Sequence, residues 1–174
     1  MQFKKTALIE FLGLVDEELD KPIYLIAVGG TAMTLLNLKA STRDIDFNLS
    51  GNDVEMFNKV LAQIPHGFEI HIYADGLIFS QQLPDDFIKK CIAIETKCIK
   101  IKLFALHPVD IVVSKIGRLN RRDLQDIETC IKKSKLTRAQ IEKRGEQVEY
   151  VGKEENYRNN LRSIIERFFK NNPK

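Results

Sequence analysis

Apolar residues recur along the chain at spacings that predict helices and short strands in turn. They follow helical spacing from Phe3 to Leu19, and Pro22 stops that helix because proline cannot continue one. The unbroken apolar run Ile23–Val28 predicts a buried strand. Further strands are expected at Asp44–Leu49, Phe68–Tyr73, Leu77–Ser80, Ile92–Glu95 and Cys98–Phe104, and further helices at Thr31–Leu38, from Val54 to about Pro65, at Phe87–Cys91, from Pro108, at Arg121–Lys133, from Leu136 and at Tyr157–Phe169.

This succession of elements predicts an α/β (α+β) fold with a small mixed sheet, helices mainly on one face, and a C-terminal helical extension. Near Lys135 the sequence becomes basic and purely helical. Residues 132–174 contain 12 Lys/Arg and 6 Glu, so this segment carries +6 and the rest of the chain −3. We therefore expect a domain over residues 1–135 and a basic helical extension over 136–174 that packs on it.

Composition places the chain among ordinary globular proteins. Of its 174 residues, 44% are hydrophobic and 29% charged, and no apolar run approaches the roughly 18 residues that span a bilayer. The N-terminus does not match a signal peptide. The three cysteines form no CxxC pair and the three histidines are far apart, so a structural zinc site is not expected. These features suggest a cytoplasmic protein with no membrane partner.

The strand Ile23–Val28 runs directly into two glycines, Gly29 and Gly30, followed by Thr31. A glycine turn between a strand and a helix offers backbone N–H groups and the positive end of a helix dipole, and both suit a phosphate. Glycine allows a close approach, and the Thr31 hydroxyl can add a hydrogen bond. Many such turns use glycine for packing alone. The sequence matches neither a Walker A loop nor the three-glycine dinucleotide fingerprint.

Two carboxylates follow on the next predicted strand. Asp44 and Asp46 are two residues apart, so they share one face of a strand and repel each other unless a cation lies between them. Oxygen ligands suit a hard cation such as Mg²⁺ or Mn²⁺. Paired acids also occur on strand ends exposed to water. A phosphate-binding turn next to a carboxylate pair, however, is the arrangement that metal-assisted phosphoryl transfer requires.

The two motifs together resemble those of the DNA polymerase beta-like nucleotidyltransferase superfamily. The stretches Val28-Gly29-Gly30-Thr31-Ala32-Met33 and Ser41-Thr42-Arg43-Asp44-Ile45-Asp46-Phe47 are similar, more narrowly, to the abortive-infection nucleotidyltransferases of toxin–antitoxin systems. The resemblance covers roughly residues 25–131. It implies transfer of a nucleoside monophosphate from an NTP, with Asp44 and Asp46 as metal ligands and Gly29, Gly30 and Thr31 at the β- and γ-phosphates.

The same relatives carry a downstream lysine on a helix and an arginine–aspartate element. The segment Ser114–Asp126 matches this pattern, which implies that Lys115 contacts nucleotide phosphate and that Asp123 is a polar partner in the cleft. On the residues alone, Lys115 could instead extend to the surface and Asp123 could form a surface ion pair.

One position departs from the superfamily pattern. A third carboxylate usually lies on a later strand, which corresponds here to Phe68–Tyr73, and the residues expected to face outward there are Glu69, His71 and Tyr73. Glu69 could replace the aspartate with a longer side chain, and His71 could act as a base or metal ligand. Alternatively, the site binds nucleotide without turnover.

We therefore expect a metal-dependent nucleotidyltransferase that modifies an RNA (tRNA) or protein hydroxyl, in a toxin–antitoxin setting. The first alternative is a catalytically degenerate relative that binds nucleotide or RNA as a regulatory protein. The second is an interaction protein whose basic C-terminal helices bind nucleic acid or a cognate partner.

Overall fold

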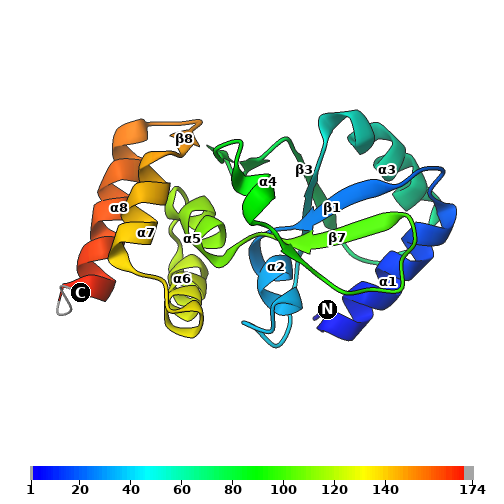
Figure 1. Cartoon of the computed structure of the whole chain (residues 1–174), viewed down its shortest axis with the longest axis horizontal. Helices are drawn as coiled ribbons and strands as arrows, with labels where there is room; N and C mark the ends of the chain where they lie inside the picture. Colours follow the sequence, from blue (N-terminus) through cyan, green and yellow to red (C-terminus); the bar gives the residue numbers. More distant parts are fainter. Residues whose placement is uncertain (1, 171–174) are drawn as a thin grey trace. The chain divides into compact units, whose positions relative to one another are not determined.

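A five-stranded mixed sheet forms the frame of the first of two compact units in the computed structural model, which describes residues 2–170 (Figure 1). This unit comprises the chain up to Asp75 together with Cys91–Leu106. Its helices and strands are α1 (Lys5–Glu18), β1 (Ile23–Ala27), α2 (Gly29–Leu35), β2 (Ile45–Leu49), α3 (Gly51–Gln63), β3 (Ile70–Ala74), β6 (Ile92–Ala93) and β7 (Ile101–Ala105).

The sheet has the strand order β3-β2-β1-β7-β6. Strand β1 runs parallel to β7 and antiparallel to β2, and β2 runs parallel to β3. The register places Ile26 opposite Asn48, and Asp46 opposite His71. Since side chains directly opposite each other share a face of a sheet, Asp46 and His71 project from the same face.

The other face of the sheet supplies the hydrophobic core. On β1, Ile23, Leu25 and Ala27 are almost completely buried, whereas Tyr24 is exposed. The same alternation on β7 buries Ile101, Leu103 and Ala105 and exposes Lys102. Helix α2 contacts β1, β2 and β7, and α3 contacts both β3 and α1. The apolar run Ile23–Val28 is predicted as a buried strand, and β1 is buried at every position except Tyr24.

Strand β7 begins three residues later than the sequence predicts, at Ile101 instead of Cys98. The preceding backbone is bound by a side chain from α1: the Asp16 carboxylate accepts hydrogen bonds from the N–H groups of Ile99, Lys100 and Ile101, at 2.9, 2.8 and 2.6 Å. Strand β6 is likewise shorter than predicted, since it ends at Ala93. The segment between β6 and β7 is thus a loop anchored by Asp16, and it is longer than the two residues left between the predicted strands Ile92–Glu95 and Cys98–Phe104.

We expect Asp16→Asn to destabilise the fold by about 2 kcal/mol, because the amide loses the charge that the three N–H groups face. Burial alone would raise the pKa of Asp16, but the hydrogen bonds from Ile99, Ile101 and Lys100 outweigh burial and lower it. The carboxylate therefore contributes stability above its ordinary pKa, and this contribution is lost as the pH falls through the lowered pKa of the folded state.

Denaturant unfolding at neutral and acidic pH measures this effect. The free energy of unfolding of the parent protein should fall more steeply below about pH 4 than that of Asp16→Asn. Glu18→Gln is the matched control, because Glu18 is an exposed carboxylate on the same helix. Equal acid sensitivity in Asp16→Asn and the parent protein would contradict the role of Asp16.

The second compact unit comprises Gly76–Lys90 and the chain from His107 onward. Helices α5 and α6 pack on each other, and α7 and α8 pack on each other and on α5 (Figure 1). Its elements are β4 (Leu77–Ile78), β5 (Gln81–Gln82), α4 (Phe87–Lys90), α5 (Pro108–Ile116), α6 (Arg121–Ser134), α7 (Arg138–Glu146), β8 (Glu149–Tyr150) and α8 (Glu154–Phe169).

Side-chain caps fix where three of these helices begin. His107 caps α5 through its Nδ1, which accepts the Val109 N–H at 3.2 Å. Asn120 and Thr137 cap α6 and α7 in complete capping boxes, with Asp123 and Gln140 as their respective partners. The predicted starts of α5 and α6, at Pro108 and Arg121, are confirmed, and Thr137 lies where the sequence predicts a helix to begin.

A buried ion pair joins α7 to α5. The Arg144 guanidinium donates to both oxygens of Asp110, and to Asp86 at 2.5 Å. Burial raises the pKa of Asp110 above its ordinary value, although Arg144 opposes the shift. On α8, the Tyr157 hydroxyl donates to the Val113 carbonyl oxygen at 3.2 Å, which ties this helix to α5 as well.

A three-stranded sheet of order β4-β5-β8 also belongs to this unit, and the sequence predicts only its first strand. The mixed α/β fold class is nevertheless confirmed, with a mixed five-stranded sheet and helices at the C-terminal end. None of the helices in residues 2–170 is long and apolar enough to cross a membrane. The predicted domain division at residue 135 stays a prediction.

Candidate nucleotidyltransferase site

The glycine turn and the carboxylate strand form one hydrogen-bonded structure in the first unit. Gly29 has φ = +53°, a left-handed conformation that favours glycine, and α2 begins at this residue, two residues earlier than predicted. A Cβ atom at Gly30 would lie 2.6 Å from the Thr42 hydroxyl oxygen. Both glycines therefore have a structural reason to be here: one for backbone conformation, the other for the close approach of Thr42.

Thr31 connects this turn to the carboxylates. Its hydroxyl donates to the Asp44 carbonyl oxygen at 3.1 Å and accepts the Asp46 N–H at 3.0 Å. The Thr42 hydroxyl donates to the same Asp44 carbonyl at 2.9 Å. Thr31 is completely buried, and its two hydrogen bonds support the start of β2.

The two predicted metal ligands lie in different environments. Asp44 is exposed in a bend just before β2, whereas Asp46 lies within β2 and is only 5% exposed. The Asp46 carbonyl oxygen accepts the Val28 N–H at 3.1 Å, which fixes its backbone from the side of β1. The strand was expected to begin at Asp44, and it begins one residue later.

The His71 imidazole contacts the Asp46 carboxylate. Its Nδ1 lies 3.1 Å from Asp46 Oδ1, and its Nε2 lies 3.8 Å from Glu69 Oε2. In the tautomer with a proton on Nδ1, His71 donates to Asp46 and keeps a lone pair on Nε2. The Glu69 side chain is 87% exposed, so it is the less constrained of the two candidates for the third position.

Lys115 and Asp123, the remaining predicted site residues, lie together in the second unit. The Lys115 ammonium is buried between two carboxylates, 3.2 Å from Asp123 Oδ1 and 3.0 Å from Asp126 Oδ2. The side chain is 4% exposed, so Lys115 does not extend to the surface as the alternative interpretation proposed. In this arrangement its charge is already paired within the second unit.

Asp123 is the centre of this polar cluster. It also accepts two hydrogen bonds from Arg118, each 2.8 Å long, and one from the Asn120 N–H. Burial alone would raise the pKa of Asp123, but the Arg118 hydrogen bonds and the charges of Lys115 and Arg118 outweigh it and lower the pKa. Asp123 is therefore a carboxylate at neutral pH. The sequence pattern Ser114–Asp126 includes both Asp123 and Asp126, but it led us to assign a role in the site to Asp123 only.

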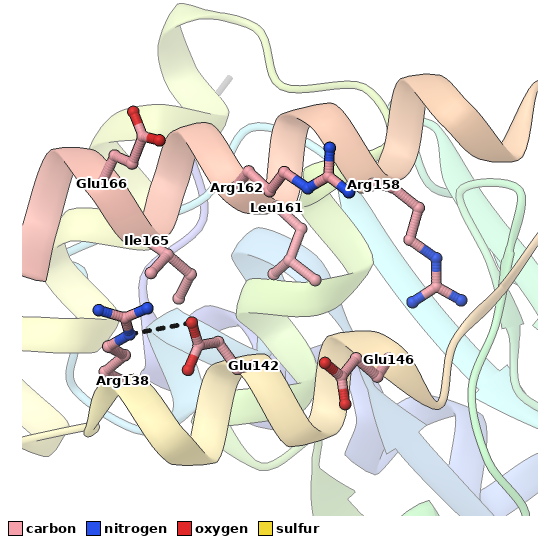
Figure 2. A pocket seen from close by; sticks show the side chains of 8 residues that line it. All are labelled: Arg138, Glu142, Glu146, Arg158, Leu161, Arg162, Ile165 and Glu166. Atoms are coloured by element: carbon pink, nitrogen blue, oxygen red, sulfur yellow. Dashed lines mark hydrogen bonds and ion pairs between the residues drawn. The ribbon is translucent and has the colours of Figure 1, made fainter.

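Elsewhere in the second unit, a groove of about 460 Å³ lies between α7 and α8 (Figure 2). Leu161 and Ile165 project into it from α8, and three arginines and three glutamates line it. Arg138 and Glu142, both on α7, form an ion pair in which Arg138 Nε lies 2.9 Å from Glu142 Oε1. None of the predicted site residues lines this groove, so we do not assign the reaction to it.

The family model described as "Nucleotidyltransferase of unknown function (DUF6036)" matches residues 4–172. The chain belongs to this family. The match spans both compact units, so the glycine turn, the carboxylate strand and the Lys115–Asp123 cluster are all parts of one nucleotidyltransferase family sequence. No curated protein and no solved structure matches the chain.

Proposed function

We propose that this family member transfers a nucleoside monophosphate from an NTP to a hydroxyl group of an RNA, such as tRNA, or of a protein. The acceptor oxygen forms a bond to the α-phosphorus, and the bond from that phosphorus to the oxygen bridging it to the β-phosphate breaks. Pyrophosphate leaves, and the acceptor hydroxyl loses its proton. In the toxin–antitoxin setting that the resemblance implies, a cognate protein would be a further partner.

One observation carries the proposal: Thr31 and Thr42 hold the carboxylate strand directly against the glycine turn. A substrate phosphate at the N–H groups of Gly29 and Gly30 would lie beside the start of β2, because the Thr31 hydroxyl bonds to both Asp44 and Asp46. The first N–H groups of a helix have no hydrogen-bond acceptor within the helix, so they can donate to a phosphate. The turn would thus bind phosphate through its backbone.

Asp44 and Asp46 have the carboxylate donors that suit Mg²⁺ or Mn²⁺. Within residues 2–170, no group of three or more His, Cys, Asp or Glu side chains could hold a metal ion. A hard cation at Asp44 and Asp46 would therefore draw further oxygen ligands from the triphosphate and from water. When bound, it would neutralise charge on the phosphates.

The experiment that tests the proposal uses each α-labelled NTP with Mg²⁺, alone, with total tRNA and with cell lysate. We expect label to enter RNA or protein and pyrophosphate to be released. Label in RNA identifies RNA as the acceptor class, and label in protein identifies a protein hydroxyl. Absence of label from both, with a folded protein and any of the NTPs, would refute the transfer reaction.

A degenerate nucleotide-binding protein is the second candidate, and two observations favour it. His71 lies opposite Asp46, on the strand where the superfamily pattern leads us to expect an acid, and the Lys115 ammonium is paired with two carboxylates. This candidate predicts binding of Mg²⁺–NTP without release of pyrophosphate. Equilibrium nucleotide binding measured beside the transfer assay separates the two candidates.

If His71 takes part in transfer, His71→Asn should lower the rate about 100-fold, because the amide can still hydrogen-bond to Asp46 but cannot accept a proton as imidazole does. Glu69→Gln should change the rate only a few-fold, since the Glu69 side chain is 87% exposed. Single-turnover transfer at saturating NTP measures both. Equal rates for His71→Asn and the parent protein would remove His71 from the reaction.

A further inference from the structure

Tyr24 is an exposed aromatic residue on β1, the central strand of the five-stranded sheet. Its side chain is 68% exposed, although the residues on either side of it along β1 are buried. A single exposed apolar residue needs no explanation by itself. Tyr24 is not isolated, however: its ring stacks on that of Phe104 in β7, with centroids 6.0 Å apart and planes inclined by 25°.

A cation lies beside this aromatic pair. The parallel register of β1 and β7 places Lys102 directly opposite Tyr24, and both side chains are exposed. Residues opposite each other in a parallel pair share a face, and Phe104, two residues after Lys102, lies on that face too. The sheet therefore presents two stacked rings and an ammonium group together.

The aromatic pair is on the same face of the sheet as Asp46. Tyr24 is four residues before Val28, whose N–H bonds to the Asp46 carbonyl, which corresponds to about 13 Å along β1. Ile26 and Asn48 lie between them on this face and are buried. The rings, of which Tyr24 is exposed and Phe104 half-buried, are thus separate from the carboxylate site and do not form a wall of it.

We propose that Tyr24, Phe104 and Lys102 form a stacking site for a base of single-stranded RNA, with Lys102 at a phosphate of the same strand. The inference rests on the proposed function insofar as RNA is its acceptor. Exposed aromatic rings bind unpaired bases because every base has a π-face, and an adjacent lysine neutralises the backbone. A duplex hides its bases, so it cannot use this surface in the same way.

Fluorescence anisotropy with a short, labelled oligoribonucleotide of mixed sequence tests the site. The parent protein should bind the single strand more tightly than the duplex, and more tightly than an abasic strand of equal length. Tyr24→Ala and Tyr24→Leu should each weaken binding about tenfold, whereas Tyr24→Phe, which keeps the ring, should bind as the parent does. Lys102→Ala should lower the slope of log affinity against log salt by about 0.7.

Leu14→Ala is the control, because Leu14 is also an exposed apolar residue of the first unit, on α1. It should leave RNA binding unchanged. Thermal unfolding should show that every variant is folded, as expected for substitutions at exposed positions. Equal binding of the abasic strand and the normal strand would overturn the proposal. So would equal affinity of Tyr24→Leu and Tyr24→Phe, or no binding of RNA by the parent protein.

The test is separable from that of the transfer reaction. Asp46→Asn should bind the oligoribonucleotide as the parent protein does, because the aromatic pair does not include the carboxylates. RNA binding that depends on Tyr24 in a protein that transfers no label would support the stacking site and refute the reaction. Label transfer to RNA, together with unchanged RNA affinity in Tyr24→Leu, would support the reaction and refute the stacking site.

Discussion

Asp46→Asn is expected to lower nucleotidyl transfer by about a thousandfold while leaving the protein folded. The substitution removes the negative charge that a hard cation requires and retains the size of the side chain. The backbone bonds of this residue, to the Thr31 hydroxyl and from the Val28 N–H, do not involve the carboxylate. The structure around the glycine turn should therefore survive, and only the chemistry should be lost.

Label transfer from α-labelled NTP measures the activity of Asp46→Asn, and circular dichroism and thermal unfolding report its fold. Asp20→Asn makes the same chemical change at an exposed position of the first unit and should be fully active. Asp46→Asn that is folded and transfers label at the parent rate would refute the role of Asp46. If Asp46→Asn does not fold, Asp44→Asn is tested in its place, because Asp44 is exposed and its substitution should leave the fold intact.

The parts of the candidate site that the sequence predicts are those that local chemistry determines. Gly29, Gly30 and the Asp44–Asp46 pair are separated by one short helix, so their motif is visible in a single stretch of sequence. The role of Thr31 is not visible in that way. Its hydroxyl is used by the backbone of residues 13 and 15 positions later, and that pairing exists only once β2 lies against α2.

The missed hairpin between β4 and β5 has a different cause. Its two loop residues, Phe79 and Ser80, both have positive φ, at 49° and 69°. Such a turn is usually signalled by asparagine or glycine, and phenylalanine is an unusual residue for it. The Arg118 guanidinium lies 4.4 Å from the centre of the Phe79 ring. Phe79 thus has a positive φ that its local sequence does not favour, and its ring contacts Arg118, a residue 39 positions later in the chain.

Burial of Lys115 could not be predicted for a similar reason. The sequence shows Lys115, Asp123 and Asp126 on neighbouring helices, which is equally compatible with a surface lysine. Only the packing of α5 on α6 brings both carboxylates to the same ammonium group. The sequence pattern includes all three residues, and the structure shows that they are paired.

Lys115→Met is expected to destabilise the protein by about 3 kcal/mol, because it removes the cation from between two carboxylates that are almost completely buried. Methionine retains the length of the side chain, so loss of packing is small. Asp123 keeps its hydrogen bonds from Arg118 and Asn120, whereas Asp126 loses the Lys115 ammonium. Removal of the Asp126 charge should therefore relieve part of this cost.

The double variant Lys115→Met/Asp126→Asn tests that assignment, and it should recover a substantial part of the lost stability. Lys143→Met, at an exposed position on α7, should change the free energy of unfolding by less than about 0.5 kcal/mol. Denaturant unfolding measures all three variants, and NTP affinity is measured beside it. If Lys115 serves mainly as a phosphate contact, Lys115→Met will weaken NTP binding with little change in stability, and the double variant will recover nothing. If Lys115 is instead a structural ion pair, Lys115→Met will lower the free energy of unfolding and the double variant will recover part of it. This result is expected because the charges that Lys115 balances are those of Asp123 and Asp126.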